Sequence, residues 1–343
     1  MTLLFRTTQN VGRVVWRQTF RTATRPSAAL IETDKPNRNH SSATLSSVAY
    51  PSLSSVASST IDRVQLSSAL NARYFSAQAV NPEIKLYQYN ICPFCHITKS
   101  LISYSKLDYE SVEVNPLTKA ELKPWSGDYK KVPIALIDEE QANGSEEIVE
   151  SILDSPRVQT ILEQRWSEEC SNDNGADGTN KMTMQQFQES ENAKKWIHFA
   201  RDDLAAILYP NICSSLSDSY DAFGYVKYVD SFSSVQKMSI QYLGALAMYF
   251  AASKIKSKRN ITDERATLHE ALDKVEREGL QDGKLDYLSG CQCPDMGDVA
   301  VFGVLNSVKG LDAHKDAIQT RGGEVKEWYD RMHEQVLGEE AKY

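Results

Sequence analysis

The chain has 343 residues, a formal net charge of −8 at pH 7 and an apolar fraction of 41%, values that suit a globular protein of two domains of ordinary size. The charge is divided unevenly, because residues 1–76 hold nine Lys and Arg against three Asp and Glu, and the rest of the chain carries about −14. So acidic a body argues against a nucleic acid as the partner.

Residues 1–76 are rich in Arg and Ser, contain no acid before Glu32, and lack the long apolar core of a secretory signal or a membrane span. We interpret them as an organelle transit peptide, with a disordered tail as the alternative. Arg73-Tyr-Phe-Ser76 resembles a mitochondrial processing site, which predicts a mature chain that starts near Ser76 in the mitochondrion. Six cysteines without regular spacing then indicate free thiols rather than a disulfide framework.

Two cysteines one helical turn apart follow a short apolar run. Residues 84–89 are apolar or β-favouring and predict a buried strand, and helical spacing of apolar residues over 94–107 predicts a helix. Cys92 then lies at the strand-to-helix turn, where free N–H groups and the helix dipole favour a thiolate, and Pro93 suits a first helical position. Cys92 is therefore the candidate nucleophile. Cys95 is either a resolving partner or a small buried hydrophobe.

Four interpretations of this motif are open. A thioredoxin-like thiol site requires a later strand preceded by proline, which residues 131–137 supply with Val-Pro. Because His96 follows the second cysteine, the string also matches c-type haem attachment. A zinc site would need Cys291 and Cys293, whose spacing is tighter than usual for zinc, so no metal site is expected. The fourth interpretation is a purely structural pair of buried cysteines. The flanking strand, Pro93 and the later Val-Pro favour the thioredoxin-like site.

The next elements fit the same pattern. Residues 109–114 alternate as a second strand, 118–125 predict a short helix, and Val132-Pro133 opens a third strand. In thioredoxin-like folds this proline is cis, which turns the preceding N–H and C=O outward to pair with a bound peptide such as glutathione. Val132 would then bind a ligand through its main chain. An ordinary trans proline at the start of a strand is the alternative.

A polar hairpin over residues 137–143 leads to Gly144-Ser145 and a helix that runs to Leu153. Ser145 is a candidate N-cap, and a helix start with free N–H groups suits a carboxylate such as that of a γ-glutamyl group. Most serines at such positions only cap the helix, so this signal is weak when taken alone.

Beyond an Asn-, Asp- and Gly-rich stretch at 170–181, the pattern is helical throughout. One apolar stripe starts at Trp196 and is expected to end at Pro210. Residues 235–255 hold a longer stripe, whose apolar core is too short to span a bilayer and predicts a buried bundle helix. Asp295-Met-Gly-Asp298 is a capping-box-like helix start. No transmembrane helix is predicted.

These elements predict an α+β protein with an N-terminal thioredoxin- or glutaredoxin-like domain at 82–165, a linker at 166–184 and an all-helical domain at 185–340. This is the architecture of cytosolic-type glutathione transferases, and the chain resembles the prostaglandin E synthase 2 family (membrane-associated type). The matching stretches run in order across roughly residues 84–315: Leu86-Tyr-Gln-Tyr-Asn-Ile-Cys-Pro-Phe-Cys95, Val112-Glu-Val-Asn-Pro116, Tyr129-Lys-Lys-Val-Pro-Ile134, Lys195-Trp196, Tyr209-Pro-Asn211, Tyr242-Leu-Gly-Ala-Leu-Ala-Met-Tyr249, Asp298-Val-Ala-Val-Phe-Gly-Val-Leu305 and Gly310-Leu-Asp-Ala313.

The resemblance implies roles for the matching residues. The catalytic cysteine of the family falls on Cys92, with the Tyr89 hydroxyl placed to hydrogen-bond its thiolate. The family's Asp-Ser glutamyl-binding pair falls on Gly144-Ser145, so the acid is absent here, although Glu146 is near enough to substitute for it. The implied catalytic residues are Cys92, Tyr89 and Cys95. The implied glutathione-binding residues are Cys92, Phe94, Val132, Pro133, Gly144 and Ser145.

The resemblance also implies an isomerase that converts the lipid endoperoxide prostaglandin H2 to prostaglandin E2. It further implies that the protein binds glutathione and binds haem through the glutathione sulfur. A homodimer and peripheral membrane association are implied as well. A glutaredoxin-like thiol–disulfide oxidoreductase, or a glutathione–haem binding module, remains the alternative. The two hypotheses differ in whether Cys95 is dispensable.

Overall fold

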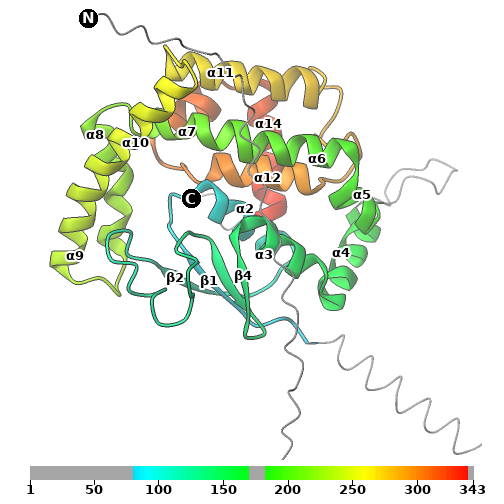
Figure 1. Ribbon diagram of the computed structural model, residues 1–343. Coiled ribbons are helices and arrows are strands. Elements are labelled where there is room, and N and C mark those ends of the chain that lie inside the picture. Colours follow the sequence, from blue (N-terminus) through cyan, green and yellow to red (C-terminus); the bar gives the residue numbers. More distant parts are fainter. Residues whose placement is uncertain (1–79, 170–181, 339–343) are drawn as a thin grey trace, which may run out of the picture. The chain divides into compact units, whose positions relative to one another are not determined.

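The computed structural model describes residues 80–169 and 182–338. The predicted transit peptide and the Asn-, Asp- and Gly-rich stretch at 170–181 lie outside these residues. The described chain is a four-stranded sheet covered by helices, followed by an all-helical part (Figure 1). Among the described residues, none of the helices combines the length and the apolar composition that a membrane span requires.

The sheet is mixed and has the order β2-β1-β3-β4. Its centre is β1 (Ile84–Gln88), which pairs in parallel with β2 (Glu110–Glu113) and antiparallel with β3 (Ile134–Ile137). The fourth strand, β4 (Glu140–Asn143), forms a hairpin with β3 from the stretch that the sequence predicted only as a polar hairpin. Because β1 is buried and β2 follows it by a helical crossover, the thioredoxin-like topology predicted from the sequence is confirmed.

Three helices accompany the sheet: α2 (Pro93–Tyr104), α3 (Gly144–Leu153) and α4 (Pro156–Glu169). The short helix predicted over 118–125 is wrong, because that stretch consists of turns. The side chain of Asn115 accepts the N–H groups of Leu117 and Thr118, and Lys119 has a φ of 51°. A turn capped by asparagine and a left-handed residue together prevent the helix from starting.

The helical part begins at Met182 and is built mainly of α-helices that continue into one another through short π or 3-10 segments. Its elements are α5 (Met184–Glu189), α6 (Glu191–His198), η1 (Phe199–Leu204), α7 (Ala205–Ile212), α8 (Leu216–Ala222), η2 (Phe223–Tyr228), α9 (Ser234–Ser239), η3 (Ile240–Gly244), α10 (Ala245–Lys258), α11 (Glu264–Lys274), η4 (Val275–Gly279), α12 (Met296–Asn306), α13 (Asp312–His314), η5 (Lys315–Thr320) and α14 (Gly323–Leu337).

Helix α12 joins the two parts of the chain. It is buried from Met296 to Leu305. Its contact with α2 is the most extensive contact between two elements of the described chain. Gly303 makes this contact possible, since a Cβ there would lie 2.7 Å from the backbone oxygen of His96. The predicted capping box is confirmed: Asp295 caps α12, and the Asp298 side chain accepts the Asp295 N–H.

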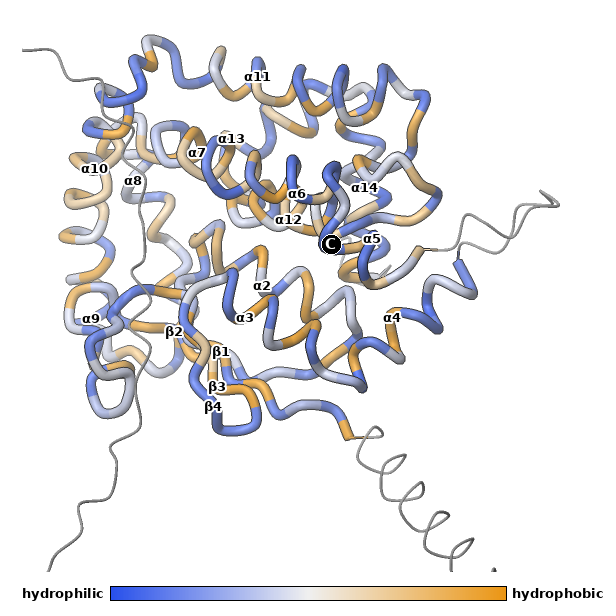
Figure 2. The backbone as a smooth tube through the Cα atoms, turned by 45° about the vertical axis from the view of Figure 1, so that its right-hand side comes forward, coloured by the Kyte–Doolittle hydropathy of each residue, from blue (hydrophilic) through white to orange (hydrophobic). Residues whose placement is uncertain are grey.

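Two helix predictions are wrong. Pro210 lies inside α7, which continues to Ile212. The second error concerns residues 235–255, because α9 and α10 run along the edge of the helical part and much of α10 is coloured hydrophobic in Figure 2. Of α10, only Ala245 and Ala252 are buried. Together, α9, η3 and α10 therefore present an apolar surface outward, formed by Val235, Met238, Tyr242, Leu243, Leu246 and Phe250.

Candidate functional site

Cys92 is the N-cap residue of α2. Its backbone is extended (φ −85°, ψ 117°), and Pro93 occupies the first helical position. A turn closes in front of it, with the Cys92 N–H donating to the Tyr89 carbonyl at 3.0 Å. Its sulfur is therefore presented to the free N–H groups of the first turn, as the sequence predicts.

The two cysteines have opposite electrostatics. The pKa of Cys92 is lowered, first by a hydrogen bond from the Cys95 thiol and then by the backbone N–H groups of Cys95 and Phe94, against burial and the charge of Glu113. The pKa of Cys95 is raised well above its usual value by burial and by its contact with Cys92. This arrangement favours Cys92 as thiolate and Cys95 as the thiol that donates to it.

Tyr89 lies near the pair, and burial together with the charges of Cys92 and Cys95 raises its hydroxyl pKa. In the described chain, the hydrogen bonds that stabilise the Cys92 thiolate come from Cys95 and Phe94 rather than from the Tyr89 hydroxyl. The backbone of Tyr89 instead stabilises the thiolate form of Cys95. Tyr89 therefore lies near Cys92 as predicted, but the predicted hydrogen bond from its hydroxyl to the Cys92 sulfur is not observed.

The predicted glutathione-binding backbone is brought together at the open end of the β3–β4 hairpin. The Val132-Pro133 peptide bond is cis, as expected. The Pro133 carbonyl accepts the N–H of Gly144 at 2.9 Å, which joins the Val-Pro segment to the start of α3. Because Val132 precedes β3 and makes no backbone hydrogen bond to another described residue, its main chain is available to a bound peptide.

The start of α3 differs from the prediction. Asn143, not Ser145, is the N-cap residue, and the Asn143 N–H donates to the Glu147 carboxylate at 3.0 Å. Ser145 lies inside the first turn and is buried. Gly144 has a φ of +83°, and a Cβ there would lie 3.2 Å from the Tyr129 hydroxyl oxygen. The chain therefore has a backbone reason for glycine at the position where the family has an acid.

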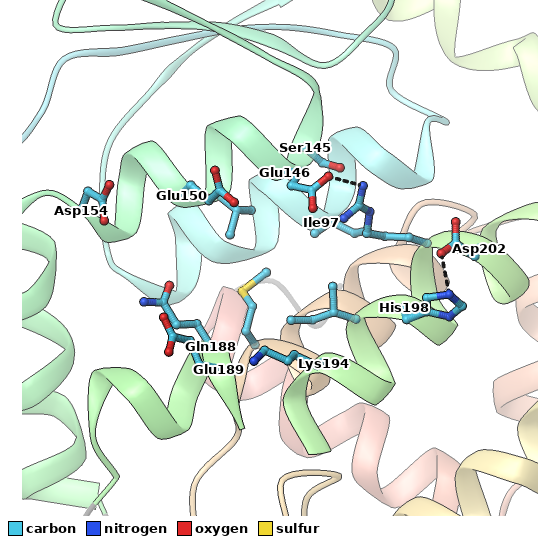
Figure 3. Close-up of a pocket in the computed structure, with 14 residues that line it drawn as sticks. Ile97, Ser145, Glu146, Glu150, Asp154, Gln188, Glu189, Lys194, His198 and Asp202 are labelled. Carbon is cyan, nitrogen blue, oxygen red and sulfur yellow. Dashed lines mark hydrogen bonds and ion pairs between the residues drawn. The ribbon is translucent and has the colours of Figure 1, made fainter. Parts of the chain in front are cut away.

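A cavity of about 590 Å³ lies between α3 on one side and α5 and α6 on the other (Figure 3). Ser145 and Glu146 line it from α3, and Lys194 lines it from the helical part. Across one end, Arg201 forms an ion pair with Glu146 at 2.8 Å. The hydrogen bond from this guanidinium lowers the pKa of Glu146. The acid that could substitute at Gly144 is therefore already paired with a cation of the helical part.

Four residues of this neighbourhood were not singled out from the sequence. Arg201 pairs with Glu146, and the charges of Cys92 and Cys95 act on the hydroxyls of Tyr129 and Tyr209. The Glu113 carboxylate accepts a hydrogen bond from the Asn90 N–H, in the turn before the nucleophile. Tyr129, Tyr209 and Glu113 occur in the stretches that carry the family resemblance, but their spacing along the chain gives no signal that they meet.

The haem-attachment and zinc interpretations find little support. The imidazole Nε2 of His96 contacts the Asn90 carbonyl at 2.7 Å, and burial lowers the His96 pKa to about 3. Cys293 is disulfide-bonded and Cys291 is free, so the expectation of free thiols fails at Cys293. Residues 80–169 and 182–338 contain no group of three His, Cys, Asp or Glu side chains that could hold a metal ion.

Comparisons with known proteins place the chain in a family. The glutathione S-transferase N-terminal domain family matches residues 86–157, and the C-terminal domain family matches residues 259–331. Prostaglandin E synthase 2 of Mus musculus is 30% identical over 277 residues, covering 74% of this chain and 70% of the mouse protein. The protein of the same name from Danio rerio is 31% identical over 271 residues, covering 73% and 70%. The chain belongs to the prostaglandin E synthase 2 family.

Solved structures give lower overall similarity. A glutathione S-transferase from Sinorhizobium meliloti is 11% identical, with a TM-score of 0.45 and coverage of 75% of this chain and 91% of that chain. Glutaredoxin 2 from Salmonella typhimurium, in complex with glutathione, is 15% identical, with a TM-score of 0.38 and coverage of 75% and 95%. The fold of the prostaglandin E synthase 2 family member described here is a thioredoxin-like domain followed by a helical glutathione-transferase-like domain.

Proposed function

We propose that this family member is an isomerase that converts prostaglandin H2 to prostaglandin E2, with Cys92 as its nucleophile. The observation that carries the proposal is the Cys92 sulfur at the start of α2, where the Cys95 thiol and two backbone N–H groups lower its pKa. The family relationship at about 30% identity supports the substrate class.

The chemistry follows from a thiolate at this position. The Cys92 sulfur attacks the endoperoxide oxygen on C9, the O–O bond breaks, and the C11 alkoxide takes a proton. A base then removes the C9 hydrogen, the C9 ketone forms as the S–O bond breaks, and the thiolate is regenerated. Tyr89 and Tyr209 are candidates for the proton donor, because both hydroxyls lie within the electrostatic influence of Cys92 and Cys95 and an alkoxide is a far stronger base than a tyrosine phenolate.

Glutathione fits the residues present here. The main chain of Val132 can pair with its cysteinyl backbone, and the buried start of α3 at Ser145 suits its γ-glutamyl carboxylate. The ion pair of Glu146 and Arg201 presents one charge of each sign beside that position, which matches the ammonium and carboxylate of the γ-glutamyl end. Bound there, glutathione would supply a second thiol close to Cys92.

Haem remains a proposal from the family resemblance. The histidine nearest the thiol pair along the sequence, His96, is buried and contacts the Asn90 carbonyl, so it would not hold a haem. A haem at this site would depend on a sulfur ligand. Titration of the glutathione-loaded protein with haem, followed by absorbance, tests this point.

The second candidate function is a glutaredoxin-like thiol–disulfide exchange. It is favoured by the direct contact between Cys95 and Cys92, because attack of the Cys95 sulfur on a mixed disulfide at Cys92 would release the substrate thiol. Under this function Cys95 is required, whereas the isomerase cycle returns to a free thiolate without it.

The test measures both activities in the Cys92→Ser and Cys95→Ser variants, with Cys291→Ser as the matched cysteine control. If the protein is the proposed isomerase, Cys92→Ser should lose prostaglandin E2 formation and Cys95→Ser should retain most of it. Loss of disulfide reduction in both variants, with no prostaglandin E2 formed above the protein-free blank, would establish the exchange function instead.

Location and assembly are further parts of the proposal. The Arg-rich, acid-poor sequence before Ser76 supports import into the mitochondrion, and terminal sequencing of the protein from its native cells tests it.

We also propose a homodimer. The outward apolar surface of α9, η3 and α10 supports it. Six large hydrophobic side chains there are 42–68% exposed to solvent, and an apolar patch of this kind marks a surface that another molecule covers.

A further inference from the structure

Glu113 is the last residue of β2 and lies opposite Gln88 in the β1–β2 register. Its Oε1 accepts the N–H of Asn90 at 2.9 Å, and its Oε2 accepts the Gln88 side-chain amide at 3.4 Å. Tyr225, in η2 of the helical part, also hydrogen-bonds to this carboxylate. One carboxylate therefore ties β2, the turn after β1 and the helical part together.

Asn90 belongs to the turn that carries the nucleophile, since this turn closes between the Tyr89 carbonyl and the Cys92 N–H. The other side of the Asn90 residue is held as well, because its carbonyl contacts the His96 ring at 2.7 Å. Glu113 and His96 thus hold the turn from two elements. A shift of Asn90 would move Cys92 with it.

The carboxylate of Glu113 also acts on the thiol through its charge. Burial raises the pKa of Glu113 to about 7, against hydrogen bonds from the Asn90 N–H and Tyr225 and the positive charge of Lys99. When ionised, Glu113 raises the pKa of Cys92. The titratable and charged groups that face Glu113 come from several elements. They are Tyr89 and Cys92 from the turn, Lys99 from α2, Tyr225 and Tyr228 from η2, and Asp230 from the loop after η2.

Glu113 has a route to solvent on its outer side. It lines a cavity of about 350 Å³ together with Asn90, Ser111, Tyr225 and Asp230. Asn90, Ser111 and Asp230 are exposed and Glu113 itself is half-buried, so the carboxylate can exchange its proton with solvent.

We propose that Glu113 is a positioning residue for Cys92: it holds the turn that carries the thiol and places a titratable carboxylate in the electrostatic field of that thiol. The proposal rests on the proposed role of Cys92 as nucleophile. Protonated Glu113 favours the Cys92 thiolate, and ionised Glu113 opposes it, so the two titrations are linked around neutral pH.

The experiment measures the alkylation rate of Cys92 with iodoacetamide across neutral pH, with Cys92 identified by peptide mass spectrometry. Glu113→Gln keeps an oxygen that can accept the Asn90 N–H but removes the charge. The apparent pKa of Cys92 should fall by about half a unit, which is an about threefold faster alkylation below that pKa. Glu110→Gln, the same change on an exposed residue of the same strand, should leave the profile unchanged.

Tyr225→Phe is a second variant that leaves Glu113 in place. Loss of its hydrogen bond should keep Glu113 protonated to higher pH and lower the apparent pKa of Cys92 as well. Identical Cys92 profiles in the wild type and both variants would overturn the proposal. Because alkylation needs no substrate, this result is independent of whether prostaglandin H2 is isomerised.

Discussion

The thiol of Cys95 hydrogen-bonds to the sulfur of Cys92, and this contact does more to lower the Cys92 pKa than either backbone N–H group that faces the same sulfur. Reactivity at Cys92 thus depends on its neighbour in the motif as well as on the helix start. Burial of Cys95 ensures the direction of the bond, because it keeps Cys95 protonated.

Replacing Cys95 should therefore change the acidity of Cys92. We expect Cys95→Ala to raise the apparent pKa of Cys92, since the donor is lost, and Cys95→Ser to raise it less, since a hydroxyl can still donate. The rate of Cys92 alkylation against pH measures both. Cys291→Ser is the control, and a Cys92 profile that is the same in Cys95→Ala and the wild type would contradict the assigned roles.

Local patterns made much of this site predictable from the sequence. A strand, a turn and Pro93 fix where Cys92 lies, because each depends on neighbours within a few residues. The failures are of another kind. Glu113 and Arg201 meet their partners across 23 and 55 residues of chain, and no periodicity in the sequence reports such contacts. The short helix at 118–125 failed because the Asn115 side chain competes for the first N–H groups.

The outward surface of α9 and α10 shows a second limit. Apolar residues at helical spacing indicate a face that is buried, but the pattern is the same whether the covering partner is the same chain or another. The sequence therefore predicted the stripe correctly and its location in the bundle wrongly. Exposure of Tyr242, Leu243 and Phe250 became visible only in the structure.

If this surface forms a homodimer, a charge on it should dissociate the assembly. Leu243 is 56% exposed, so Leu243→Lys should leave the fold intact and convert the protein to a monomer by light scattering, since a buried unpaired ammonium is costly in an interface. Leu117→Lys, at an exposed leucine of the thioredoxin-like domain, is the matched control. A wild type that is already monomeric at all concentrations, or a Leu243→Lys dimer, would rule out this interface.

Stability should fall in acid because of buried histidines. Burial lowers the pKa of His96 to about 3 and that of His314 to about 4. Both rings are neutral in the folded state but become charged below about pH 6.5 in the unfolded chain. The stability that they contribute is therefore complete above that pH and is lost as the pH falls toward 3.

His314 offers the cleaner test of this effect. It is buried, its ring packs edge-on against Tyr329 at 5.1 Å, and neither ring nitrogen has a hydrogen-bond partner among the described residues. His314→Phe keeps the ring and removes the unpaired nitrogens, so the free energy of unfolding should rise by about 1 kcal/mol or more at neutral pH. Its decrease on acidification should become smaller. Urea unfolding at neutral and acidic pH measures both.

His198→Phe makes the same substitution at a side chain that is 73% exposed and is the surface control for that series. Equal acid dependence in His314→Phe and the wild type would mean that the imidazole of His314 is not neutral in the folded protein.

Glutathione affinity should depend on the charges at the end of the α3 cavity. Restoring the acid of the family by Gly144→Asp is not a clean test, because Gly144 has a φ of +83° and a Cβ there meets the Tyr129 hydroxyl. Glu146→Gln keeps the shape of the side chain and removes the charge proposed to receive the γ-glutamyl ammonium. Its glutathione affinity should fall about tenfold, the loss expected for one partly exposed charged hydrogen bond. Calorimetric titration measures it.

The same cavity supplies the control and the counter-test. Glu150→Gln removes an acid one turn farther along α3 in the same cavity and should leave the affinity unchanged. Arg201→Gln frees Glu146 from its ion pair but removes a cation for the γ-glutamyl carboxylate, so it too should weaken binding. Val132→Pro removes the main-chain N–H itself and should abolish binding. If Arg201→Gln binds glutathione more tightly than the wild type, then Arg201 competes with the ligand for Glu146 and does not hold the carboxylate.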